Sequence, residues 1–115
     1  INPNNSEILR NIGWILCTQK KTLSGRAILR RAINLDPANA LAFSDLGASY
    51  MFQGKLKEAQ KWITQARTID PLDLTILETA DQLDHLSSLA KIFPKRKVRK
   101  PKVKKVRVQN STKAT

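Results

Sequence analysis

Apolar side chains recur at helical spacing through the last segment before Pro94. They are Leu74, Leu77, Ala80, Leu83, Leu86 and Ala90. Positions three or four residues apart lie on one side of an α-helix. Asp73 can cap the start of this helix, and Pro94 stops it. The pattern therefore predicts a single helix over residues 74–93.

Before this helix, similar short sequence segments recur at a constant interval. INPNN at residues 1–5 is echoed by INLDPAN at residues 33–39 and by TIDPLD at residues 68–73. Each segment contains one proline, and the three are equally spaced along the chain at Pro3, Pro37 and Pro71. The number of residues from one of these prolines to the next is called the period below. A residue before proline is disfavoured in a helix, so each Asp-Pro pair is expected to end one, and Asn39 and Asp73 are expected to cap the next. A period of this length is typical of helix-turn-helix repeats.

Small and large apolar residues stand at corresponding places in the two units. In the second unit they are Phe43, Leu46, Gly47, Tyr50, Ala59, Ile63 and Ala66. In the first unit they are Leu9, Ile12, Gly13, Leu16, Gly25, Leu29 and Ala32. A glycine lets two helices approach closely, so Gly13 and Gly47 are expected at the helix crossings. The segment 53–55, which contains Gly54, supplies the turn of the second unit, whereas the corresponding turn at residues 19–22 has no glycine.

This period and these residues resemble the tetratricopeptide repeat family over residues 1 to about 92. The resemblance implies an all-α fold, a helix-turn-helix solenoid of two repeats and a closing helix. The repelling charges and the prolines that follow this helix predict a disordered basic C-terminal tail. The implied division is 1–5 as the end of a preceding repeat, 6–39 and 40–73 as repeats, 74–93 as a capping helix and 94–115 as the tail. We therefore expect the chain to be the C-terminal part of a longer array. A short N-terminal cap ahead of a two-repeat domain is the alternative.

In this family the first helix of each repeat lines a concave groove that binds a peptide or a partner helix. The positions of this sequence that the resemblance places there are Arg10, Trp14, Ser44, Ala48, Met51, Phe52, Glu78, Gln82 and His85. Trp14 is either an interface anchor or a packing residue within the array. One family subset holds the acidic C-terminus of chaperones with basic and asparagine side chains. Asp45 stands at one of those places and would repel a carboxylate, so the resemblance implies protein binding without that ligand.

Basic residues are concentrated at the C-terminus. The formal net charge is +12, and residues 91–115 contain eleven Lys and Arg and no Asp or Glu. The candidate polyanion-binding or nuclear-import residues are Lys95, Arg96, Lys97, Arg99, Lys100, Lys102, Lys104, Lys105 and Arg107. Such a segment can contact nucleic-acid phosphates, act as an import signal, bind an anionic membrane surface, or merely keep the chain soluble. Because residues 94–115 contain no aromatic residue to stack on bases, nucleic-acid binding by them would be non-specific and salt-sensitive.

No set of residues indicates catalysis, a metal or a cofactor. The one histidine, His85, lies within a helical turn of Asp81 and Asp84, but these residues are too few for a typical metal site. A single cysteine, Cys17, favours an intracellular location, cytoplasmic or nuclear. No apolar run is long enough to cross a membrane.

Three hypotheses for the function follow from the sequence. The first is a non-enzymatic scaffold that binds a protein partner in the groove and uses the tail for localisation or polyanion contact. The second is an RNA- or ribosome-associated protein bound mainly through the tail. The third is an accessory region of an enzyme whose catalytic domain lies upstream.

Overall fold

The computed structural model describes residues 5–93, and these residues form helices and no strand. The helices are α1 (Ser6–Thr18), α2 (Thr22–Leu35), α3 (Ala40–Met51), α4 (Leu56–Ile69) and α5 (Leu74–Ile92). The predicted all-α fold is thus confirmed over this range. The tail predicted for residues 94–115 lies outside the described residues.

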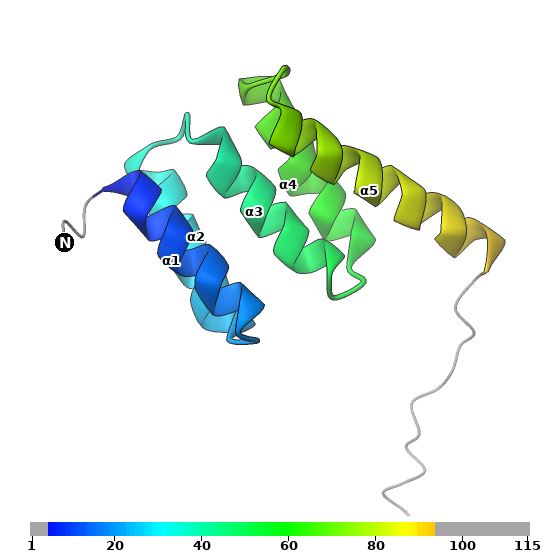
Figure 1. Cartoon of the computed structure of the whole chain (residues 1–115), viewed down its shortest axis with the longest axis horizontal. Helices are drawn as coiled ribbons and strands as arrows, with labels where there is room; N and C mark the ends of the chain where they lie inside the picture. The colour runs from blue at the N-terminus through cyan, green and yellow to red at the C-terminus, as the bar shows by residue number, and fades with distance from the viewer. Residues whose placement is uncertain (1–4, 94–115) are drawn as a thin grey trace, which may run out of the picture.

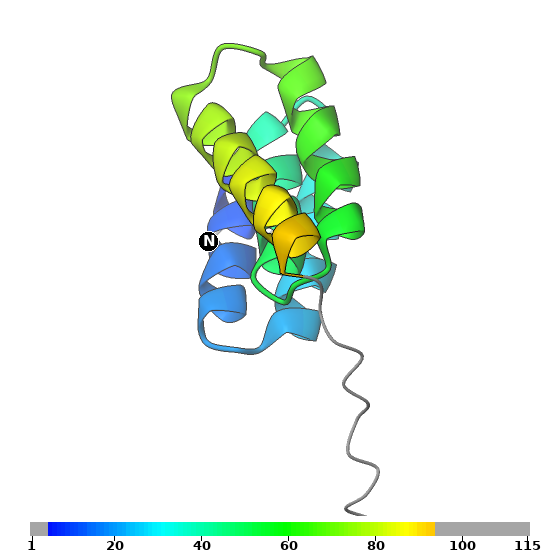
Figure 2. The same cartoon turned by 90° about the vertical axis from the view of Figure 1, so that its right-hand side faces the viewer.

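The helices are arranged in two layers. The helices α1, α3 and α5 form one layer, and α2 and α4 form the other (Figures 1 and 2). Along the chain, α1 packs antiparallel to α2, and α3 packs antiparallel to α4 (Figure 1). The last helix, α5, packs against α4 and also touches α3. Helix α3 is therefore the middle helix of its layer, in contact with both α1 and α5.

Three helices begin at side-chain caps that recur with the period. The side-chain oxygen of Asn5 accepts a hydrogen bond from the amide of Ile8 at 3.0 Å. Asn39 caps α3 in the same way at 3.2 Å, and Asp73 caps α5 at 3.1 Å. Each cap satisfies an amide that the first turn of a helix leaves without a backbone partner. The capping predicted for Asn39 and Asp73 is confirmed.

Glycine sets the closest approach within each helix pair. A Cβ placed on Gly13 would lie 2.8 Å from Leu29 Cγ, and one on Gly47 would lie 2.6 Å from Ile63 Cγ1. Both distances are far inside van der Waals contact, so a larger residue would push the helices apart. The predicted crossings at Gly13 and Gly47 are confirmed.

A buried arginine joins the first helix pair to the second. Arg26 of α2 is only 5% exposed, and its Nε donates a hydrogen bond to Ser49 Oγ at 2.9 Å. Its Nη2 donates to the carbonyl of Ser49 at 3.1 Å and to Gln53 Oε1 at 2.6 Å. The guanidinium lies over the ring of Tyr50, 3.7 Å from its centre. These contacts give the buried cation polar and aromatic partners from α3 and the turn after it.

The buried stripe of α5 differs from the predicted one. Its buried residues are Ile76, Ala80 and Leu83, whereas Leu74 is 76% exposed and Leu86 is 38% exposed. The reason is that α4 and α3 cover α5 from one side only, and Leu74, which is two residues before the buried Ile76, lies on the opposite side of the helix. The predicted extent of the helix, residues 74–93, agrees with the observed Leu74–Ile92. None of the helices in residues 5–93 is long and apolar enough to cross a membrane.

Candidate functional site

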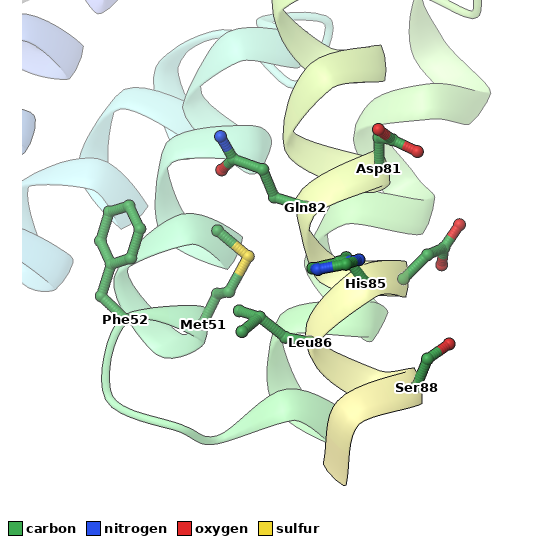
Figure 3. A pocket seen from close by; sticks show the side chains of 8 residues that line it. Met51, Phe52, Asp81, Gln82, His85, Leu86 and Ser88 are labelled. Carbon is green, nitrogen blue, oxygen red and sulfur yellow. The ribbon is translucent and has the colours of Figure 1, made fainter. Parts of the chain in front are cut away.

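A hollow of about 720 Å³ lies between the C-terminal end of α3 and the second half of α5. Its α3 wall consists of Met51 and Phe52, and Gln82, His85 and Leu86 are among the residues of its α5 wall. These three side chains project from α5 toward Met51 and Phe52 (Figure 3). Asp81 and Ser88 border the same hollow but point away from α3 (Figure 3), and Asp84 completes the border.

A second hollow of about 430 Å³ lies between α1 and α3. It is lined by Trp14, Cys17, Thr18, Lys20, Thr22, Ser49, Phe52 and Gln53. Because Phe52 lines both hollows, the two adjoin across the layer of α1, α3 and α5. The two hollows together are called the groove below.

Phe52 is the most exposed aromatic residue that lines the groove. It follows the last residue of α3, and 67% of its surface is accessible. The centre of its ring lies 6.1 Å from that of Trp14, which is half-buried. An exposed aromatic side chain beside a hollow gains free energy when a ligand covers it. Phe52 is therefore the main apolar contact that the groove offers.

The predicted groove residues separate into two sets. Trp14, Met51, Phe52, Gln82 and His85 come together as lining residues, as the resemblance implies. The others line neither hollow, and they are Arg10, Ser44, Ala48 and Glu78.

These four residues lie in three kinds of environment. Ser44 and Ala48 are 2% and 6% exposed because α3 is flanked by α1 and α5 along this part of its length. Arg10 pairs with acidic residues, and Glu78 is exposed on α5. Of the predicted groove residues in α3 and just after it, only Met51 and Phe52 line a hollow.

Leu86 is a lining residue that the sequence pattern placed only in the apolar stripe of α5. It stands one period after Phe52, and Thr18 stands one period before Phe52. All three line the groove. The position of Leu86 in the groove could therefore have been predicted from that of Phe52 by the period. Lys20, Thr22 and Gln53 were also missed, because they come from turns and helix ends that fold back beside the hollow between α1 and α3.

Charged residues border the two hollows unequally. The hollow between α3 and α5 is bordered by Asp81 and Asp84 and by no Lys or Arg among the described residues. The hollow between α1 and α3 is bordered by Lys20, and the buried Arg26 contacts its lining residues Ser49 and Gln53. The groove is therefore acidic at its α5 end and basic at its α1 end.

Next to the groove, Arg10 and Asp45 form a partly buried ion pair between α1 and α3. Arg10 Nη1 lies 2.9 Å from Asp45 Oδ2, and Arg10 Nε lies 3.3 Å from Glu7 Oε1. Burial raises the pKa of the Asp45 carboxyl, and the hydrogen bond and charge of Arg10 only partly offset this. Burial disfavours the charge of Arg10, but Asp45 and Glu7 outweigh it and raise the pKa of Arg10. Arg10 is therefore charged at all ordinary pH values, so within the Arg10–Asp45 pair only the shift of Asp45 affects pH dependence.

Cys17 lines the hollow between α1 and α3 as a thiol whose environment disfavours the thiolate. Burial raises the pKa of the Cys17 thiol, and the nearby charge of Arg26 offsets this only in part, so Cys17 is protonated at neutral pH. No group of three or more His, Cys, Asp or Glu side chains that could hold a metal ion is found within residues 5–93. The predicted polyanion-binding residues, from Lys95 to Arg107, lie outside the described residues.

The chain matches no protein-family model, and a search of curated proteins finds no significant relative.

Proposed function

We propose that the chain is a non-enzymatic protein-interaction module that binds a peptide or a partner helix in the groove. The observation that carries the proposal is Phe52, which is 67% exposed at the junction of two hollows. Aromatic anchors in concave surfaces contribute most of the binding energy in many interfaces. Trp14 lies beside Phe52 and gives the ligand a second aromatic contact.

We further propose that the helices are repeats of the tetratricopeptide class. Three structural features that recur with the period support this assignment. They are the caps Asn5, Asn39 and Asp73, the crossing residues Gly13 and Gly47, and the positive φ angles of Lys20 and Gly54. A shared backbone conformation at a constant period is the property expected of true structural repeats.

The groove favours a ligand with two apolar side chains. Each hollow has room for at least one side chain, and Phe52 forms the ridge between them. A basic group of the ligand would be favoured beside Asp81 and Asp84, and an acidic group beside Lys20. The order of charges along the ligand would then determine its direction in the groove.

The proposal can be tested by selection from a displayed library of random twelve-residue peptides. Peptides enriched on the whole chain are synthesised with a fluorescent label, and their affinity is measured by anisotropy. Phe52→Ala is expected to weaken binding at least tenfold, because it removes the ridge between the hollows. Leu23→Ala is the matched control, since Leu23 is 82% exposed on α2 and lines neither hollow. Enriched peptides that bind Phe52→Ala as tightly as the wild-type chain would contradict the proposal.

Trp14→Ala distinguishes the two interpretations of that residue. If Trp14 is a binding residue, the variant loses affinity for the selected peptides and keeps its melting temperature. A lower melting temperature with unchanged affinity would instead make Trp14 a packing residue.

A second candidate function is polyanion binding through the C-terminal residues. It is favoured by the eleven Lys and Arg, without any Asp or Glu, in residues 91–115. Anisotropy of a short labelled RNA and of a DNA duplex would be measured across a salt series for residues 1–115 and 1–93. Binding that needs residues 94–115 and falls steeply with salt is expected, because bound cations release counterions from the phosphates. Absence of binding near physiological salt would exclude this candidate.

A further inference from the structure

The outward side of α1 carries apolar residues. The residues at the equivalent positions of α3 and α5, the other two helices of its layer, are covered by neighbouring helices. On α3 these places are Ala42, Leu46 and Ser49, which are all less than 5% exposed. On α5, one period later, they are Ile76, Ala80 and Leu83, and none is more than 6% exposed. On α1, one period before α3, they are Ile8, Ile12 and Ile15. These three isoleucines are called the outer face of α1.

The outer face of α1 is incompletely covered. Ile15 is 52% exposed, Ile12 is 37% exposed and Ile8 is half-buried. Figure 1 shows α1 at the edge of its layer, with no described helix on its far side. Isolated exposed apolar residues are common in proteins, but three isoleucines on one side of a helix form a continuous surface that gains from burial.

The equivalent places on α3 and α5 show what kind of element covers such a surface. The second helix of the preceding pair packs there in both cases, α2 against α3 and α4 against α5. An alanine near the C-terminal end of that helix makes the contact. Ala32 packs with Ala42, and Ala66 packs with Ile76.

The opposite end of the described helices lacks such a surface. The place that Gly47 occupies in α3 is taken by Asp81 in α5, and the place of Tyr50 is taken by Asp84. Both aspartates are exposed, so another helix packed there would have to bury two carboxylates. The two ends therefore differ, with an apolar surface on α1 and a charged surface on α5.

The residues before α1 have the sequence of a connection between two helix pairs. Ile1 stands one period before Leu35 and two periods before Ile69, which are the last residues of α2 and α4. Asn5 then caps α1 as Asn39 and Asp73 cap α3 and α5. The connections Asp36–Asn39 and Asp70–Asp73 have the same length as the segment from Asn2 to Asn5 that separates Ile1 from α1.

We propose that the outer face of α1 binds the second helix of a further helix pair, which precedes it in the same polypeptide. That helix would be amphipathic and would have Ile1 as its last residue. An alanine near its C-terminal end would contact Ile8. The inference does not depend on the groove, which lies on a different side of α1 through Trp14, Cys17 and Thr18. If an experiment disproves one of the two proposals, the other is unaffected.

The test supplies a helix pair of known structure. A copy of residues 40–68, which contains α3 and nearly all of α4, is joined directly to Ile1 of the whole chain. Urea unfolding is followed by circular dichroism for the extended and the original chains. If the added pair packs on α1, the extended chain unfolds in one transition with a higher midpoint and a larger m-value, because more surface is exposed on unfolding.

Substitutions in the outer face establish where the added pair binds. In the extended chain, Ile15→Lys and the double variant Ile12→Lys/Ile15→Lys are expected to return the midpoint to that of the original chain. Leu23→Lys is the control and is expected to keep the gain, since Leu23 is exposed on α2 and belongs to a different surface. The unextended Ile15→Lys chain is measured in parallel to show that the substitution alone does not unfold α1.

Three results would overturn the proposal. The first is an extended chain with an unchanged midpoint. The second is a gain in midpoint that survives both lysine variants. The third is a dimer of the original chain in sedimentation velocity that Ile15→Lys abolishes, because a second copy would then be the occupant of the outer face.

Discussion

Lys20 and Gly54 adopt the same left-handed backbone conformation at places that are one period apart, with φ angles of 67° and 77°. Each lies in the turn that joins the two helices of a pair. Glycine adopts this conformation readily, whereas a residue with a Cβ is strained in it. The turn geometry is therefore the same in both units, although only one of them has the residue that favours it.

Lys20→Gly is expected to stabilise the chain by about 1 kcal/mol, because it removes this strain. The reverse change offers a matched comparison. A Cβ on Gly54 would meet no atom within 4 Å, so Gly54→Ala should cost a similar amount through backbone conformation alone. Both values can be measured by urea unfolding. A stability that falls in Lys20→Gly would show that the side chain of Lys20 is more important than its φ angle.

Gly25→Ala is expected to be the most damaging glycine-to-alanine change in the described helices. Its new Cβ would lie 2.5 Å from Cys17 Sγ and 2.7 Å from the backbone oxygen of Gly13. Backbone atoms of a packed helix cannot move aside easily, and overpacking of this kind costs about 1–3 kcal/mol. Gly47→Ala should cost less, because its nearest atom belongs to the side chain of Ile63. Thermal unfolding followed by circular dichroism would rank the two, and the reverse order would contradict the close approach of Gly25 to the backbone of α1.

Arg26→Lys is expected to destabilise the chain by about 2 kcal/mol, because a lysine cannot donate to Ser49 and Gln53 with the same fork of nitrogens. Arg30→Lys is the control on the same helix. Arg30 is exposed and donates to the hydroxyl of Tyr50, so its replacement should change the free energy of unfolding by less than about 0.5 kcal/mol. Equal effects of the two variants would mean that the buried bridge contributes no more than an exposed hydrogen bond.

Asp45 gives the stability a specific dependence on pH. Its pKa is raised in the folded chain by burial, so the folded state binds a proton more readily than the unfolded state. The resulting contribution to the free energy of unfolding is complete below the pKa of the unfolded carboxyl. It is lost as the pH rises through the higher pKa of the folded one.

The pH dependence can be isolated with Asp45→Asn, which removes the titrating group. The difference in free energy of unfolding, wild type minus Asp45→Asn, should fall as the pH rises through this acidic window and be constant above it. Urea unfolding at a series of pH values measures this difference. A difference that rises with pH would mean that Arg10, rather than burial, dominates the environment of Asp45.

The sequence determined the helices and their ends because the signals for them are local. Asn39 and Asp73 cap helices through their own side chains, and Asp36 and Asp70 follow the last helical residues Leu35 and Ile69. A proline restricts the residue before it whatever the rest of the fold does. The period likewise placed Gly13 and Gly47 at the helix crossings, since only a small residue at a constant interval allows the same close contact twice.

The tertiary structure decided which residues of these helices are open to a ligand. Ser44 and Phe52 both belong to the predicted groove, yet one is 2% exposed and the other 67%. Their difference depends on how closely α1 and α5 flank α3 along its length, which no local pattern records. The burial of Arg26 has the same origin, because its hydrogen bonds to α3 and the turn after it outweigh the preference of a charged residue for water. The positive φ of Lys20 likewise contradicts the preference of its residue type.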